Sequence, residues 1–237
     1  MRKILITGAS RGIGKAIAIR LLKEGNSLSL GVRNKEDLIN TPLDPNLNNP
    51  ETFMVHKYDA TDKASSKQWI KKTVKVFKNI DTIIHCAGIL KRTKLIFNDD
   101  EIKDIEDVWK VNVLGPWILT KDAWKYLSIG NSGRIIVLVS MSGKRSKGRL
   151  ASYSMSKFAL MSLCQTMRNE GWNKGIRVTS ICPGWVNTDM AKEINNFPKE
   201  EMTQTNDIAN ICSNLLELPN TSVPFEIAIN CQLETTN

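Results

Sequence analysis

Short apolar runs alternate with amphipathic helical patterns along nearly the whole chain. The runs at 3–7, 52–59 and 133–140 are rich in Ile, Leu and Val or in aromatic residues, and a helical pattern follows each of them. This alternation predicts an α/β fold, a doubly wound parallel sheet of Rossmann type with about seven strands and helices on both faces. No linker, repeat or change of composition interrupts the 237 residues, so we expect one domain over 1–237.

The stretch TGASRGIG at 7–14 connects the first predicted strand to a long helix. Gly8 allows a tight turn, Gly12 lets the backbone approach a pyrophosphate, and Gly14 allows the helix to pack closely on the strand. The helix N-terminus then offers free N–H groups to phosphate oxygens. We therefore predict a dinucleotide site here, with Ser10, Arg11 and Ile13 among its contacts.

The second predicted strand, SLSLGV at 27–32, is followed by Arg33 instead of the acidic residue that would read the ribose 2′-hydroxyl of NAD. Arg11 also carries a guanidinium inside the glycine loop. Two converging guanidinium groups suit a 2′-phosphate, which favours NADP(H) as cofactor. The alternative is that both are ordinary surface arginines.

Composition and charge argue against several other kinds of function. The formal net charge is +9, but basic residues form no long tract and do not alternate with aromatic residues, so we do not expect nucleic-acid binding. The cysteines and the two histidines show no metal-ligand spacing, and we expect no metal site. No apolar run is long enough for a membrane span, so we expect a soluble cytoplasmic protein without a membrane partner.

Tyr153 and Lys157 stand one helical turn apart in YSMSK, so their side chains share a helix face. Ser140 ends the predicted strand before that helix, and Asn112 lies in KVNVLG between two helical segments. With TGASRGIG, YDATD, HCAG, VLVSMSG and CPGWVNTDM, these motifs follow one another in an order that resembles the short-chain dehydrogenase/reductase family over essentially the whole chain.

The resemblance implies a catalytic set. Tyr153 would exchange a proton with the carbonyl or alcohol oxygen, and Ser140 would hydrogen-bond that oxygen. Lys157 would contact the nicotinamide ribose and lower the pKa of the tyrosine, while Asn112 would hold a water of a proton relay. A free tyrosine has a pKa of about 10, and a value of about 7 requires about 4 kcal/mol of selective phenolate stabilisation.

The resemblance also implies further cofactor contacts. Asp59, followed by Ala60, would meet the adenine, and Ala87 and Gly88 would line the adenosine ribose. The nicotinamide would lie among Pro183, Gly184, Val186 and Thr188. Residues 189–204 would form a short substrate lid, and relatives commonly assemble as homodimers or homotetramers.

Some residues depart from the family pattern or have two interpretations. His85 and Cys86 stand where the family usually has two asparagines, and a thiol cannot make the hydrogen bonds of an amide, which puts local rigidity in doubt. Trp185 either faces the substrate or packs in the interior. The loop GKRSKGR at 143–149 either attracts an acidic substrate or is simply solvated. We expect Thr205 to cap the helix that follows it.

The favoured function is that of an NADP(H)-dependent oxidoreductase, which transfers a hydride between nicotinamide and a carbonyl or secondary alcohol substrate. One alternative is a non-catalytic NADP-binding sensor, which would need the glycine loop but not Ser140, Tyr153 and Lys157 together. Another is a nucleotide-sugar epimerase or dehydratase, a class that is usually longer and spaces its glycines differently.

Overall fold

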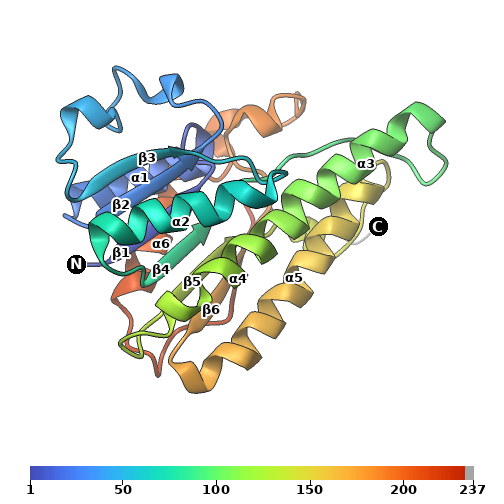
Figure 1. Ribbon diagram of the computed structural model, residues 1–237. Coiled ribbons are helices and arrows are strands. Elements are labelled where there is room, and N and C mark those ends of the chain that lie inside the picture. The colour runs from blue at the N-terminus through green and yellow to red at the C-terminus, as the bar shows by residue number, and fades with distance from the viewer. Residues whose placement is uncertain (233–237) are drawn as a thin grey trace.

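The apolar runs of the sequence form one parallel sheet in the computed structural model, which describes residues 1–232. The expected domain 1–237 therefore includes five residues, 233–237, that lie outside the described part. The sheet has seven strands in the order β3-β2-β1-β4-β5-β6-β7, which confirms the predicted doubly wound α/β fold (Figure 1). The strands are β1 (Lys3–Thr7), β2 (Ser27–Val32), β3 (Phe53–Lys57), β4 (Thr82–His85), β5 (Arg134–Leu138), β6 (Arg177–Pro183) and β7 (Glu226–Ile229).

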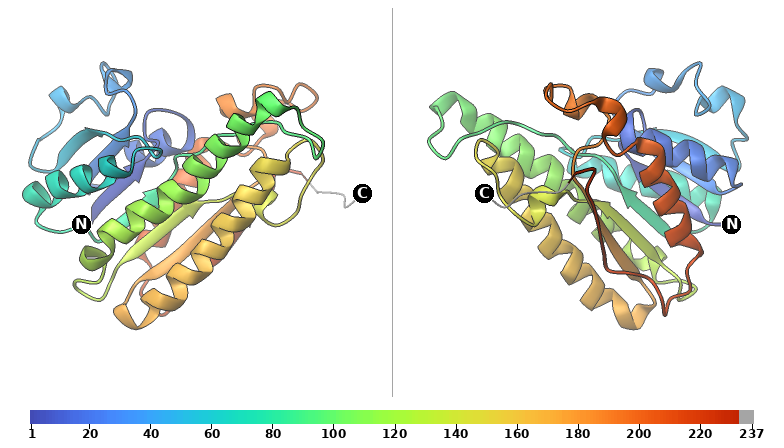
Figure 2. Two further views of the ribbon diagram at one scale, coloured as in Figure 1. Left: turned by 45° about the vertical axis from the view of Figure 1, so that its right-hand side comes forward. Right: turned by 180° about the vertical axis from the view of Figure 1, so that it is seen from behind.

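Helices cover both faces of this sheet because successive side chains of a strand point to opposite sides. In β1, Ile4 and Ile6 join one apolar core, whereas Leu5 joins the other. The first core lies under α1 (Gly12–Lys23) and α6 (Thr205–Glu217), which Figure 2 shows from behind. The second lies under α2 (Lys63–Phe77), α4 (Gly115–Leu127) and α5 (Ala151–Gly171). Burial on both faces explains why these strands are almost continuously apolar.

The strand order reverses at β1, which pairs with β2 on one side and β4 on the other. Connections from these neighbouring strands leave in opposite directions, and the carboxyl ends of the strands border the crevice where open α/β sheets bind ligands. Gly8 follows β1, Ser140 follows β5, and Gly184 follows β6. The fold thus brings the motifs of the sequence to one edge of the sheet.

The two helical segments expected on either side of Asn112 form one continuous rod. It consists of α3 (Ile102–Trp109), a π-helical turn η4 (Lys110–Leu114), and α4. Pro116, in the first turn of α4, has no N–H to donate, and a widened turn precedes it. Single π-helical turns are frequent at functional sites, and this one carries Asn112.

Short 3₁₀ turns complete the chain, and two of them lie within the expected lid. They are η1 (Glu36–Leu38), η2 (Pro45–Leu47), η3 (Asp99–Glu101), η5 (Met141–Gly143), η6 (Trp172–Lys174), η7 (Asp189–Ala191) and η8 (Lys199–Glu201). The expectation that Thr205 caps α6 is wrong. Gln204 is the N-cap, and its N–H donates to the carboxylate of Asp207 over 2.9 Å, so Thr205 already belongs to the helix.

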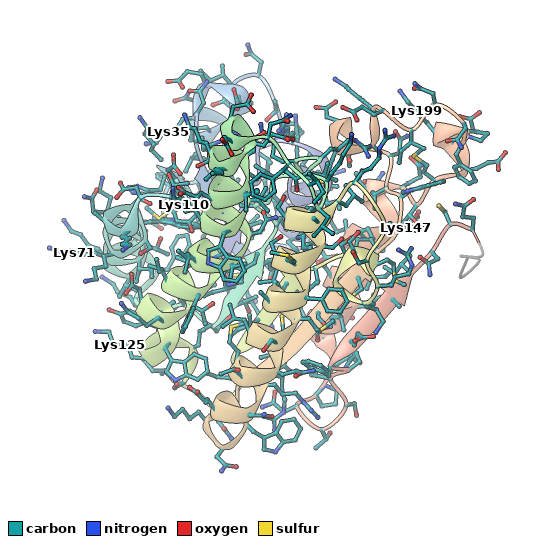
Figure 3. The ribbon with its side chains drawn as sticks, turned by 90° about the vertical axis from the view of Figure 1, so that its right-hand side faces the viewer. Lys35, Lys71, Lys110, Lys125, Lys147 and Lys199 are labelled. Carbon is teal, nitrogen blue, oxygen red and sulfur yellow. The ribbon has the colours of Figure 1, made fainter. Side chains whose placement is uncertain are left out.

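Positive charge is distributed over many elements. The six lysines labelled in Figure 3 are spread across the view, from Lys71 on α2 to Lys199 on η8. None of the helices between residues 1 and 232 combines the length and the apolar character that a bilayer crossing requires.

Candidate active site

The glycine loop is folded tightly against the segment that follows β4. Gly8 has a φ of +68°, and a Cβ atom at this position would lie 2.9 Å from the backbone nitrogen of Ala87. A Cβ on Gly14 would lie 2.3 Å from the carbonyl oxygen of Gly8. Gly12 has a φ of +54° and faces the side chain of Thr188. A side chain at any of these positions would therefore clash or strain the loop.

The N-terminus of α1 suits a diphosphate. Within the described residues, no side chain caps the first turn of α1, and that turn contains no acidic residue. Its N–H groups are therefore directed to the carboxyl edge of the sheet without an internal anion, which is the arrangement that binds phosphate oxygens. The loop and the helix thus fit a dinucleotide cofactor.

Thr7 fixes the position of the segment after β4. Its hydroxyl oxygen accepts hydrogen bonds from the backbone N–H groups of Cys86 and Ala87, both over 3.0 Å. Cys86 lies beneath Gly14, and burial raises the pKa of its thiol to about 12, so the group remains neutral. The rigidity that the missing asparagine put in doubt is supplied here by Thr7.

The arginines expected at the adenosine end lie beside two different carboxylates. The guanidinium of Arg11 forms an ion pair of 3.7 Å with Asp189 of η7. Hydrogen bonds from Thr61 lower the pKa of Asp59, and the positive charge of Arg33 lowers it further. Arg33 and Asp59 therefore lie at the same end of the sheet, whereas Arg11 reaches across to the expected lid.

Tyr153 is the third residue of α5 and only 6% exposed. Burial raises the pKa of its phenol, and a hydrogen bond with the side chain of Ser140 lowers it in part. Ser140 is itself held in place, because its Oγ accepts a hydrogen bond of 3.1 Å from the N–H of Ser142. A phenol and a hydroxyl thus meet where β5 ends and α5 begins.

Lys157 lies in the interior beside this pair. Its Nζ donates to the carbonyl oxygen of Leu138 over 2.9 Å and lies 5.7 Å from the centre of the Tyr153 ring. Burial lowers the pKa of Lys157 to about 8. A Cβ on Gly88 would lie 3.8 Å from this Nζ, so the ammonium group also borders the segment after β4.

Asn112 connects the same segment to α5. Its Nδ2 donates to the carbonyl oxygen of Ile89 over 2.9 Å and to Ser156 Oγ over 3.0 Å, and its Oδ1 accepts from the N–H of Ile89 over 2.9 Å. Ser156 in turn donates to the carbonyl oxygen of Tyr153 over 2.7 Å. Both amide hydrogens are therefore used, and only one acceptor position of Oδ1 remains for a further partner.

Sequence reasoning missed the anchor of the first turn of α5. Thr93 accepts a hydrogen bond from the N–H of Ala151 at its carbonyl oxygen and one from the N–H of Ser152 at its hydroxyl, over 2.9 and 3.0 Å. The Thr93 hydroxyl also donates to Ser152 Oγ over 2.8 Å. These bonds hold the residue next to Tyr153, and no local pattern in the sequence signals them.

The segment after β6 is joined to the sheet and to the expected lid. The N–H of Gly184, next to Pro183, donates to the carbonyl oxygen of Ile229 over 2.7 Å. Val186 forms an isolated parallel bridge with Thr203, at the far end of the lid. The rings of Trp185 and Phe197 meet edge to face at 5.3 Å, so Trp185 packs against the lid.

Comparison with known proteins identifies the family of the chain. Residues 2–199 match the family described as short chain dehydrogenase, and the chain belongs to the short-chain dehydrogenase/reductase family. Members of this family are oxidoreductases that use NAD(P)H.

Two curated relatives and two solved structures illustrate the likeness. The agropine synthesis reductase of Rhizobium rhizogenes is 35% identical over 98% of this chain and 53% of its own length, so the chain spans about half of that relative. The 3-oxoacyl-[acyl-carrier-protein] reductase of a Synechocystis strain is 29% identical over 82% of this chain and 78% of its own.

The alcohol dehydrogenase of the archaeon Thermococcus sibiricus, solved with 5-hydroxy-NADP, superposes with a TM-score of 0.84 at 28% identity, covering 96% of this chain and 95% of that one. ElxO with NADP bound gives a TM-score of 0.83 at 26% identity, covering 98% of both chains.

Proposed function

We propose that the protein is an NADP(H)-dependent reductase, which transfers a hydride between nicotinamide and a carbonyl or secondary alcohol carbon, with Tyr153 as the acid and base. The observation that carries the proposal is the buried phenol of Tyr153, which lies beside the side chain of Ser140 and the ammonium group of Lys157. The reductive direction is supported by the two curated relatives, which are both reductases by name.

In this proposal the chain positions the substrate oxygen and manages one proton. Because burial holds the pKa of Tyr153 above its ordinary value, the phenol carries a proton at neutral pH and donates it to the oxygen of a carbonyl substrate. Ser140 donates a second hydrogen bond to the same oxygen and stabilises the charge that develops there. Lys157, held by Leu138, stabilises the phenolate that remains.

The cofactor, when bound, supplies the hydride. The residues proposed to hold it are Gly8, Ser10, Arg11, Gly12, Ile13, Gly14, Arg33, Asp59, Ala60, Ala87, Gly88, Asn112, Tyr153, Lys157, Pro183, Gly184, Val186 and Thr188. The remaining acceptor position on Asn112 is available for a relay water. The preference for NADP over NAD rests on Arg33 and is supported by the NADP-type ligands of the two structural neighbours.

The protein is proposed to form a homo-oligomer in which the outer surface of α4 and α5 contacts a second copy of the chain. Three large apolar side chains are exposed there, Trp117, Met155 and Phe158, with exposed fractions of 56%, 58% and 45%. A two-fold axis would place this surface against itself and bury all three side chains twice. Light scattering should give the mass of a dimer or tetramer, and Trp117→Lys should shift it toward the monomer.

The alternative remains a non-catalytic NADP-binding sensor, which would bind the cofactor without turning it over. The deciding experiment is a panel of aldehydes, ketones and oxo acids assayed by the absorbance of NADPH, with NADH as control. Oxidation of NADPH by at least one carbonyl, faster than that of NADH, supports the proposal. Tight binding of NADPH without oxidation across the panel would favour the sensor, and a preference for NADH would contradict the cofactor assignment.

A further inference from the structure

A charged crevice is lined by residues that neighbour the first turn of α5 in the chain. It has a volume of about 550 Å³, and its charged lining consists of Arg92, Lys94 and Arg149 together with Glu101 and Glu193. Three cations against two carboxylates leave an excess of positive charge. A concave site of this size with convergent guanidinium groups is suited to an anionic group of a small molecule.

Chain connectivity ties two residues of this crevice to the turn that carries Tyr153. Arg92 immediately precedes Thr93, whose hydrogen bonds hold Ala151 and Ser152 in the first turn of α5. Arg149 precedes Leu150, the N-cap of the same helix. Both guanidinium groups therefore start from backbone that is fixed to the turn carrying Tyr153.

Arg149 has two features that a solvated loop residue does not need. Its φ is +66°, a left-handed conformation that is unfavourable for a residue with a side chain. Gly148, directly before it, could adopt this conformation without strain. In addition, the Arg149 guanidinium forms no ion pair with any carboxylate in residues 1–232, although it shares the crevice with Glu101 and Glu193.

Arg92 already holds a carboxylate. Its Nε lies 2.6 Å from Oε2 of Glu193, a residue of the 189–204 lid. Both side chains are largely exposed, with exposed fractions of 48% and 73%, so the pair is weak and can exchange. The geometry at Arg92 is thus complementary to a carboxylate, and the carboxylate bound there in the structure belongs to the expected lid.

We propose that this crevice binds the carboxylate of an oxo-acid substrate whose carbonyl group reaches Tyr153. Arg149 holds the carboxylate, and Arg92 exchanges Glu193 for it, which frees the lid segment as the substrate enters. This inference names a substrate class for the proposed reductase and rests on that function.

The kinetic test compares acids with their neutral analogues. Levulinate and its longer linear homologues, each paired with its carboxamide, are assayed with NADPH in the wild type, Arg149→Gln, Arg149→Lys and Lys147→Gln. Lys147, which is labelled in Figure 3, is the control, because it carries the same charge on the same loop and is not among the residues that line the crevice. The wild type should prefer the best acid by at least about tenfold in kcat/KM, the ratio expected for one charge-assisted contact.

Arg149→Gln should remove this preference by lowering kcat/KM for the acid much more than kcat/KM for the carboxamide, and Arg149→Lys should restore part of it. Lys147→Gln should leave the preference within about twofold, since an exposed charge that does not line the crevice acts only through a screened field. A wild type that does not prefer the acids, or a preference that Arg149→Gln and Lys147→Gln reduce equally, would overturn the inference.

A binding measurement separates this inference from the proposed function. Glutarate is titrated calorimetrically into the protein with and without NADPH. Its affinity should fall about tenfold or more in Arg149→Gln and rise in Glu193→Gln, which removes the competing carboxylate. If no carbonyl compound oxidises NADPH but glutarate shows these changes, the reductase proposal fails and the carboxylate site stands. If glutarate does not bind, or binds equally to all variants, the carboxylate site fails.

Discussion

The side-chain amide of Asn112 pairs with both backbone groups of Ile89, accepting from its N–H and donating to its carbonyl oxygen, each over 2.9 Å. An amide side chain here takes the place of a neighbouring strand, because β4 ends at His85 and no strand within residues 1–232 pairs with Ile89. Asn112 is only 1% exposed, so each of its hydrogen bonds lies away from water. The widened turn η4 carries the residue that makes them.

Replacement of this amide by a carboxylate of the same shape should be costly. Asn112→Asp loses the donations to Ile89 and Ser156 and places a negative oxygen beside the carbonyl oxygen of Ile89. We expect a loss of about 2–4 kcal/mol in the free energy of unfolding, measured by urea denaturation. Asn98→Asp is the control, because Asn98 is exposed and precedes η3, where a carboxylate is well tolerated. Equal stability of the two variants would contradict the buried role of Asn112.

The lowered pKa of Lys157 should make the free energy of unfolding depend on pH. Its pKa is about 8 in the folded protein, against 10.5 for an ordinary lysine. Between these values the unfolded chain binds a proton that the folded chain does not, so folding becomes more favourable as the pH rises. Relative to Lys157→Met, the wild type should therefore gain about 2–3 kcal/mol of stability between pH 7 and pH 10. A constant difference over this range would show that the ammonium group is not buried.

The buried His85 should make the folded protein less stable as the pH falls. Its ring is buried, and burial lowers its pKa to about 3, while Nε2 is hydrogen-bonded with Thr120 Oγ1 over 2.9 Å. As the pH falls below the ordinary value of 6.5, the unfolded chain gains a proton that the folded chain excludes, and stability is lost. His85→Gln should reduce this loss by about 3 kcal/mol between pH 6.5 and pH 4.

The control for His85 is the other histidine. His56 also has a lowered pKa, caused by burial and by the charges of Lys72 and Lys35. Because its desolvation is less complete, His56→Gln should change the acid profile less than His85→Gln does. Identical profiles of the wild type and His85→Gln would contradict the account.

Arg33 should determine the preference of the protein for NADPH over NADH. Arg33→Ala should raise the KM for NADPH by about ten- to a hundredfold and leave the KM for NADH nearly unchanged, because only NADPH carries the 2′-phosphate. Lys71→Ala, which removes one exposed charge from α2, is the control for a general electrostatic effect. Equal changes in both KM values would refute the assignment of NADP.

The sequence alone was sufficient to predict the parts of the protein that depend on local spacing. The sheet followed from the alternation of strand and helix patterns, and the loop of Gly8, Gly12 and Gly14 from the backbone conformations that only glycine adopts freely. The pairing of Tyr153 with Lys157 followed from the helical repeat. In each case the residues concerned are close in sequence, so one local rule describes their geometry.

Contacts between distant segments were not predictable in this way. The bonds of Thr93 with Ser152 join residues that are 59 positions apart, and the ion pair of Arg11 with Asp189 joins the first loop to η7. Thr205 is a suitable cap by residue type, yet Gln204 takes that position, and its side-chain amide donates to the carbonyl oxygens of Lys199 and Met202 in the expected lid. Such contacts depend on the packing of whole elements, which a single sequence does not reveal.

The most direct test of the account is the rate of hydride transfer in a single turnover by Tyr153→Phe, with the best carbonyl substrate and NADPH. This change removes one oxygen atom from a buried ring, so NADPH affinity and folding should be nearly unaffected. We predict that the transfer rate falls by at least about a hundredfold, as expected when a general acid is removed. A variant that binds NADPH normally and transfers the hydride at the wild-type rate would contradict the assignment of Tyr153 as the acid and base.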